Sequence, residues 1–409
     1  MRKPKSIAFA VLVILAVTAA TWANSVSFSG EQVPPENLRW RRQAIQIAVS
    51  SSLKANIANI KADSDIAGAL HRSLDAWQNA ANLEFQLTNS DKQNVSPSAA
   101  GDGVSLITIA ATPENLLLFA KNPEKVSATT RVFFNKRGVI TEADIVLNPY
   151  QQFSTDGTFG TFDLESVLTH ELGHLLGLDH SPLISSTMHE SYGRNGLYGL
   201  QNFISRSLAA SDVAAVRSLY GQTTADEKCC SAVTGKAIFA NGKTVNGAKI
   251  WLEEQETGRV ESLKETASDG SFRFDGLANG NYRIYTQDDR SVKMAFPAQV
   301  IGEVSVDGVD ETAATAAVKA GKIDQALSFI GFNGQLSDLA VPVNAGHVYN
   351  IYVGGKLLDT AGISFGFTSP FLSVVPNTLR PLDYGDGVSV VMFQVRVDPN
   401  APTGDYSIF

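Results

Sequence analysis

The sequence predicts an α+β chain in which a mixed, twisted sheet with helices is followed by β-sandwich domains. Strand-like alternation and helical apolar stripes are interleaved up to residue 222, and from Val233 onward short strands are separated by Asn-Gly and Asp-Gly turns. At 409 residues the chain is long enough for more than one domain. We therefore expect one mixed domain followed by β-domains.

The N-terminus has the three parts of a signal peptide. A basic stretch, residues 1–5, precedes an apolar run from Ile7 to Ala20, and small residues surround Ala23. The apolar run is short for a bilayer span. We expect residues 1–23 to be cleaved and the mature protein to be secreted into the extracellular space without a membrane span. A periplasmic or cell-surface location, or an uncleaved anchor, is the alternative.

The mature chain is acidic. The formal net charge is −8, and removal of Arg2, Lys3 and Lys5 with the signal peptide makes it more negative. Such a chain is a poor partner for nucleic acid or an anionic membrane surface. We therefore expect no nucleic-acid partner.

After a short N-terminal segment, residues 24–38, the mixed domain covers residues 39–222. Strand-like stretches occur at 45–49, 83–87, 104–110 and 128–135, and a helical stripe of Ile66, Leu70, Leu74 and Trp77 follows Asp63-Ser64. This order predicts a mixed sheet covered by helices.

Three of the six histidines fall within one eleven-residue segment, 170–180, which reads H-E-x-x-H-x-x-G-x-x-H. A helix is expected from Leu164 to Leu176, with Asp163 as its N-cap and Gly177 as its end. On this helix His170 and His174 lie one turn apart on the same face. The chain reversal at Gly177 can then bring His180 to the same point.

Three imidazoles around one ion leave one tetrahedral position open, which is the arrangement of a catalytic zinc site. Glu171 is the next residue after His170, about 100° further round the helix, and can face that open position. We expect His170, His174 and His180 to bind one Zn²⁺ and Glu171 to act as general base. A buried helix with incidental histidines and an inactive pseudoenzyme are the alternatives.

The motif resembles that of the metzincin zinc peptidases. Ser181 after the third histidine and Met188 soon after it resemble the matrixins in particular. The segments Ile140–Asn148 and Asp212–Gly221 resemble the strand before the active-site helix and the closing helix of that family. We expect Ser211 to cap the closing helix and Gly221 to end it.

The resemblance implies a metzincin-type catalytic domain with a zinc cleft along one edge strand. It also implies that Met188 lies in a tight turn beneath the metal and that the substrate is a protein or peptide. No cysteine precedes the motif, so the cysteine latency of animal matrixins is absent, and Glu31 or Glu36 is the candidate for covering the metal. Tyr192 is interpreted as a wall of the substrate pocket, with a structural tyrosine as the alternative.

Further ions are less clearly indicated. The histidines needed for the family's second zinc are missing, so that zinc is not expected. Calcium is a second candidate ion, because the loops between residues 98 and 160 carry Asp102, Asp144 and Asp156.

Residues 223–231 are expected to be a linker containing Cys229-Cys230, with a vicinal disulfide, links to another chain and free thiols all open. Residues 232–300 resemble a carboxypeptidase-regulatory-like β-sandwich through Ser268–Leu277 and Gly280–Tyr282. Residues 301–409 resemble an immunoglobulin-like β-domain through Ala401–Tyr406; we expect this domain to be incomplete or to pair its edge elsewhere.

Two functions remain open. The first is an exported zinc-dependent endopeptidase, in which the C-terminal β-domains bind a surface or polymer ligand. The alternative is a surface adhesion or interaction protein with an inactive metallopeptidase-like domain.

Overall fold

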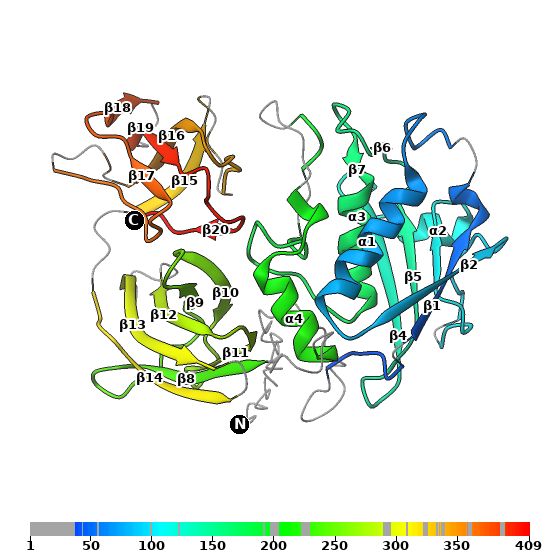
Figure 1. Cartoon of the computed structure of the whole chain (residues 1–409), viewed down its shortest axis with the longest axis horizontal. Helices are drawn as coiled ribbons and strands as arrows, with labels where there is room; N and C mark the ends of the chain where they lie inside the picture. Colours follow the sequence, from blue (N-terminus) through cyan, green and yellow to red (C-terminus); the bar gives the residue numbers. More distant parts are fainter. Residues whose placement is uncertain are drawn as a thin grey trace, which may run out of the picture.

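The computed structural model describes residues 37–409 except 43, 55–56, 99, 122, 191–192, 197–203, 222–229, 289–295, 308–309, 322–325, 333, 335, 337–339, 357, 359–361 and 385–388. The expected signal peptide, Glu31, Glu36, Tyr192 and Cys229 lie outside the described residues. Figure 1 shows three units: a first unit (residues 37–221) on one side, and a second (230–318) and a third (326–409) stacked on the other.

The first unit is built on one mixed sheet. Its strands are β1 (Ala44–Ser50), β2 (Glu84–Ser90), β3 (Leu106–Thr108), β4 (Ala128–Phe134) and β5 (Ile140–Leu147). They lie in the order β2-β1-β3-β5-β4, with β4 antiparallel to β5 and the other pairs parallel. The mixed sheet predicted from the sequence is therefore present, and β4 forms one of its edges.

Helices α1 (Ile66–Ala80) and α3 (Leu164–Leu175) pack together against this sheet, and α4 (Ala210–Tyr220) lies between α1 and the second unit (Figure 1). The first unit also contains α2 (Pro113–Leu117), 3-10 turns at η1 (Ser51–Leu53) and η3 (Ile204–Arg206), and a short strand pair formed by β6 (Phe153–Ser154) and β7 (Phe162–Asp163). Short α2, which begins with Pro113 after its N-cap Thr112, was not predicted.

The structure defines how α1 and α4 begin. The N-cap of α1 is Asp65, directly after Asp63-Ser64, and it accepts a hydrogen bond from the Gly68 amide at 2.9 Å. The expected cap of α4 was wrong: Ser211 lies inside the helix and its buried hydroxyl has no hydrogen-bond partner. Asp212 instead accepts from the Ala209 amide at 2.9 Å.

Three aromatic side chains fasten α3 to the first unit. The indole nitrogens of Trp77 and Trp40 donate to the carbonyls of Thr169 and Leu175, each at 2.8 Å. The Tyr220 hydroxyl at the end of α4 donates to the Leu176 carbonyl at 2.6 Å. The last carbonyls of a helix lack partners within the helix, so the donors from Trp40 and Tyr220 satisfy those of Leu175 and Leu176 where α3 ends, whereas Trp77 binds the helix at its middle.

The second unit is a β-sandwich. One sheet has the order β13-β12-β9-β10-β20 and the other β11-β8-β14. Their strands are β8 (Ser231–Phe239), β9 (Lys249–Glu254), β10 (Arg259–Glu265), β11 (Ser271–Leu277), β12 (Gly280–Asp288), β13 (Phe296–Val306), β14 (Glu311–Val318) and β20 (Asp405–Tyr406).

The boundary expected after residue 300 falls inside β13. Beyond it, β14 pairs in parallel with β8, so strands of this sandwich continue to Val318. The short strand β20, which comes from the third unit, completes the first sheet beside β10. Cys230, just before β8, is disulfide-bonded, which excludes a free thiol at this residue.

The third unit contributes β15 (Ala326–Phe332), β16 (Val348–Lys356), β17 (Leu372–Val374), β18 (Arg380–Asp383) and β19 (Ser389–Val397), which form one sheet. The last strand of the chain does not join this sheet but pairs with β10. Phe409 then returns to the third unit through hydrogen bonds with Gly366. Of the two possibilities that the sequence left open for this domain, the structure shows that its last strand pairs with another unit.

Within the described part of the chain, no helix is both long and apolar enough to cross a membrane.

Candidate metal centre

The chain around the histidine motif follows the predicted helix and turn. Asp163 accepts from the Ser166 amide at 3.0 Å and caps α3. Gly177 follows the helix with a φ of +94°, a left-handed conformation that favours glycine. A Cβ at this glycine would lie 2.2 Å from the Leu38 carbonyl oxygen, so the turn is packed directly against the strand-like segment that opens the first unit.

The turn brings three imidazoles together. One ring nitrogen from each of His170, His174 and His180 lies within 4.8 Å of the others. The Nε2 atoms of His174 and His180 are 3.2 Å apart. In the described residues this is the one group of three or more His, Cys, Asp or Glu side chains with the spacing of a metal site.

Two of the imidazoles are oriented by backbone carbonyls. The Nδ1 atom of His170 lies 2.7 Å from the Thr187 carbonyl oxygen, and that of His174 lies 2.8 Å from the Leu178 carbonyl oxygen. These contacts place the proton on Nδ1 and leave Nε2 as the electron-pair donor. Burial lowers the pKa of His170 well below its usual value and that of His174 to about 4, so both rings are neutral at pH 7.

The donor set fits a tetrahedral zinc ion. Two nitrogens bound at the usual Zn–N distance of about 2.0–2.1 Å lie about 3.3 Å apart, close to the His174–His180 separation. Three imidazoles, two of them neutral and oriented by carbonyls, are also the ligand type that zinc prefers.

Met188 lies directly beneath α3. It is fully buried, and a Cβ at Gly173 would lie 2.2 Å from its sulfur atom. Only a glycine at position 173 permits this approach, a requirement that the sequence reading did not identify. The segment Ser181–His189, here called the Met-turn loop, is closed by a hydrogen bond from the Ser181 amide to the Met188 carbonyl at 2.8 Å.

A carboxylate from α4 holds the Met-turn loop from within the first unit. Asp212 accepts from the Ser186 hydroxyl and from the Thr187 amide, the latter at 2.8 Å. It is fully buried, and burial raises the pKa of its carboxyl group. Since the Thr187 carbonyl also contacts His170, Asp212 stabilises the segment that orients one of the imidazoles.

Glu171 is buried beside the histidines on α3, with 3% of its surface exposed. The Thr130 hydroxyl of edge strand β4 donates to its Oε2 atom at 2.6 Å. Burial raises the pKa of Glu171 to about 7, while the hydrogen bond from Thr130 acts in the opposite direction. The sequence placed Thr130 in a strand but gave no sign of this contact.

Replacing Thr130 by valine is expected to lower kcat/KM of the peptidase proposed below by about 2- to 10-fold, the value of one hydrogen bond. Valine keeps the shape and the strand preference of threonine but cannot hold the carboxylate. Steady-state cleavage of a fluorogenic peptide measures the change. Thr129→Val, the same substitution at the adjacent strand position, is the control, and equal rates for both variants would contradict the role of Thr130.

The other candidate site residues are not part of this group. Asp102 pairs with Lys92 and Asp156 with Lys61, whereas buried Asp144 accepts from the amides of Ser96 and Leu106, each at 3.1 Å. The three carboxylates suggested for calcium thus bind different partners. Tyr192 lies outside the described residues, so its interpretation as a pocket wall remains a prediction.

The comparison with known proteins agrees with this geometry. Residues 39–221 match the Matrixin peptidase family. This segment is therefore similar to a matrixin domain, and it is called the matrixin domain below. Its bounds agree closely with the mixed domain expected from the sequence, whereas the carboxypeptidase-regulatory-like and immunoglobulin-like resemblances remain predictions.

Relatives of the matrixin domain are distant. Matrix metalloproteinase-19 of Mus musculus is 26% identical over 164 residues, which are 40% of this chain and 26% of that protein. Metalloendoproteinase 1 of Glycine max is 25% identical over 186 residues, 45% of this chain and 53% of that protein. The chain thus spans about half or less of the length of these relatives.

Among solved structures, BcpA, the major pilin subunit of Bacillus cereus, is 18% identical and covers 44% of this chain and 62% of its own, with a TM-score of 0.19.

Proposed function

We propose that the chain is an exported zinc-dependent endopeptidase whose matrixin domain hydrolyses peptide bonds. The observation that carries this proposal is the convergence of three imidazoles beside a buried glutamate. Neither feature is needed for a structural helix, because a buried glutamate without a cation costs stability. The pair of features is what metal-assisted hydrolysis requires.

In this proposal His170, His174 and His180 hold the zinc ion. When bound, zinc supplies Lewis acidity, which lowers the pKa of a water molecule and polarises the substrate carbonyl. The carbonyls of Thr187 and Leu178 fix the rings of His170 and His174, respectively, before the ion binds. This preorganisation reduces the cost of assembling the site.

Glu171 moves the proton. Its carboxylate accepts a proton from the attacking water and later donates it to the leaving amine. A pKa raised by burial to about 7 suits a group that must accept and release a proton near neutral pH. Thr130 holds the carboxylate on the side of the helix that faces β4.

The substrate is proposed to lie along β4. This strand is at the edge of the sheet, and its Thr130 contacts Glu171. An extended peptide added to that edge would bond through its main chain and bring a scissile carbonyl next to the glutamate. We propose secretion through residues 1–23 and a surface or polymer ligand for the second and third units, neither of which supplies a residue that touches the substrate or the metal.

The test is metal-dependent cleavage by the purified full-length mature chain. We expect hydrolysis of an unfolded protein and of a peptide library, loss of activity on zinc chelation, and its return when zinc is added. A serine protease treated with the same chelator is the control. A chain holding one zinc per molecule that cleaves neither substrate would overturn the proposal and favour the adhesion function.

A further inference from the structure

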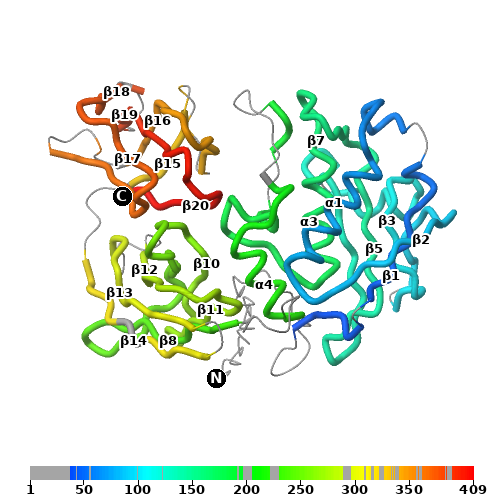
Figure 2. Tube along the Cα trace, in the orientation of Figure 1, coloured from blue at the N-terminus to red at the C-terminus, as the bar shows by residue number. Residues whose placement is uncertain are grey.

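The segment Gly404–Ser407 belongs to the third unit but contacts the second and the first units as well. In β20, Tyr406 and Asp405 pair with Arg259 and Val260 of β10. Figure 2 shows the red segment labelled β20 reaching from the third unit towards the green part of the chain near α4, before the chain turns back to its C-terminus. The segment therefore lies where the three units meet.

Asp405 reaches from this junction into the matrixin domain. Both of its carboxylate oxygens lie 3.2 Å from the Ser185 amide nitrogen, so the amide donates to the carboxylate as a whole. Asp405 and Ser185 are separated by 220 positions in the chain. Burial raises the pKa of Asp405, as expected for a carboxylate enclosed between units.

Ser185 lies in the middle of the Met-turn loop. The next residue, Ser186, bonds to Asp212, and the one after that supplies the carbonyl that contacts His170. The loop is therefore held at adjacent residues by two carboxylates. Asp212 comes from the matrixin domain itself, whereas Asp405 comes from the third unit.

Close backbone contacts join the three units at this junction. A Cβ at Gly276 of β11 would lie 2.0 Å from the Ala214 carbonyl oxygen of α4, so the second unit abuts the helix that carries Asp212. A Cβ at Gly258 would lie 2.4 Å from the Ser369 Cα, which joins the second and third units in the same way. With so little room between the units, the position of β20 relative to the Met-turn loop is defined.

We propose that Asp405 is a positioning residue of the active site. It fixes the Ser185 amide and, through the Met-turn loop, the packing of Met188 and the orientation of His170. The third unit is then a part of the scaffold of the metal centre and not only a binding module. This inference rests on the proposed peptidase function for its kinetic consequence, but not for its effect on the loop or on zinc.

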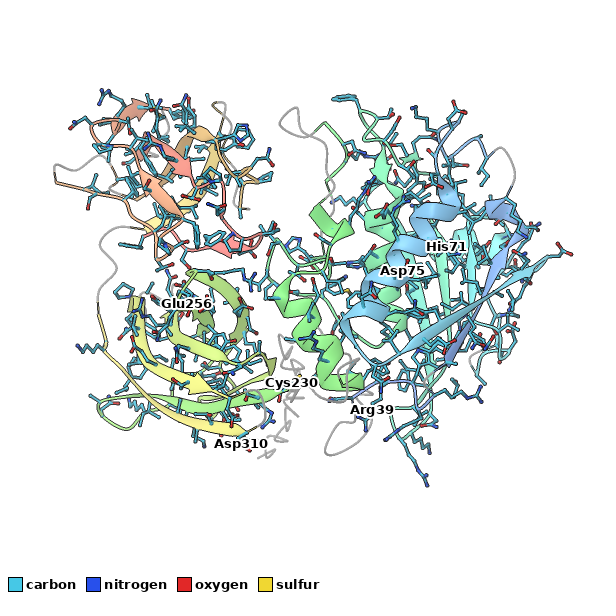
Figure 3. The ribbon with its side chains drawn as sticks, in the orientation of Figure 1. Arg39, His71, Asp75, Cys230, Glu256 and Asp310 are labelled. Atoms are coloured by element: carbon cyan, nitrogen blue, oxygen red, sulfur yellow. The ribbon has the colours of Figure 1, made fainter. Side chains whose placement is uncertain are left out.

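The test compares Asp405→Ala and Asp405→Asn in the full-length zinc-loaded protein. Asp310→Ala is the matched control, because Asp310 is exposed at the far edge of the second unit (Figure 3). Hydrogen exchange of peptides covering residues 182–188, the zinc dissociation constant by chelator competition, and kcat and KM are measured.

For Asp405→Ala we expect exchange at Ser185 to become about tenfold faster. The zinc dissociation constant should rise by about tenfold, the lower end of the contribution of an outer hydrogen-bond partner. kcat should fall with the loss of ring orientation while KM changes little. Asp405→Asn keeps one acceptor oxygen and should give intermediate values, and Asp310→Ala should match the parent.

Unchanged exchange at 182–188 together with an unchanged zinc constant in Asp405→Ala would overturn the proposal. A lower melting temperature with a normal loop and normal zinc binding would also overturn it, since it would assign Asp405 to domain docking alone. If the parent cleaves no peptide while the loop and zinc constants respond as expected, the positioning role stands and the peptidase function fails.

Discussion

Glu171→Gln is expected to lower kcat about 10²- to 10⁴-fold while zinc binding and folding are retained. Glutamine has nearly the same shape but cannot accept the proton of the attacking water. Glu171 is not among the three clustered ligand side chains, so zinc content should not change. Because burial raises the pKa of this carboxyl group, removing its charge should leave the melting temperature equal or higher.

Peptide cleavage, zinc analysis and thermal unfolding of the same preparation separate these effects. Glu114→Gln, the same chemical change on an exposed residue of α2, is the control and should behave as the parent. Retention of the parent rate in Glu171→Gln would remove Glu171 from the mechanism. Loss of both the cleavage rate and the bound zinc would instead show that Glu171 helps to hold the histidine ligands in place.

Gly177→Ala is the second change with a large expected effect. Alanine in a left-handed conformation costs about 1–2 kcal/mol, and its Cβ would in addition collide with the Leu38 carbonyl oxygen at 2.2 Å. The chain must then shift at the turn that leads to His180. We expect the zinc dissociation constant to rise about 10- to 100-fold and the melting temperature of the matrixin domain to fall.

Gly103→Ala separates the two causes. Gly103 has a φ of +83°, close to that of Gly177, but no atom lies within 4 Å of a Cβ built there. This variant should be destabilised only by the cost of placing alanine in a left-handed conformation, and it should bind zinc like the parent. Equal zinc affinities in Gly177→Ala and Gly103→Ala would show that the turn does not determine where His180 lies.

The local part of the site could be predicted because it depends on short-range geometry. His170 and His174 lie on one helix, Asp163 caps that helix, and Gly177 ends it, as the spacing indicated. Each of these contacts spans a few residues, for which helix periodicity and glycine conformation are sufficient. The convergence of His180 follows from the same turn.

The contacts that support the site could not be predicted, because they join distant segments. Thr130 and Glu171 are 41 positions apart, and Ser185 and Asp405 are 220 apart. In a single sequence nothing distinguishes Thr130 from Thr129, the other threonine of its strand. Asp212 was assigned to the closing helix, but it lies 24 positions after Met188, and nothing in the sequence indicated that it binds the Met-turn loop.

Boundaries were the least predictable part of the fold. Ser211 and Asp212 are both good helix-start residues, and only the position of Ala209 in the structure makes Asp212 the one that bonds. The boundary between the second and third units, expected after residue 300, was similarly hard to place from the sequence. Strand β13 continues through it, because β13 pairs along β12 on one side of a sandwich that also contains β14.

The crossing of β20 into the second unit makes the third unit doubly tethered. One tether is the covalent connection from β14 to β15, and the other is the pairing of β20 with β10. For the peptidase proposed above, self-cleavage is a hazard, because a protease meets its own connecting segments at high local concentration. A single nick between β14 and β15 would leave the fragment noncovalently docked, and the damaged molecule would keep its architecture.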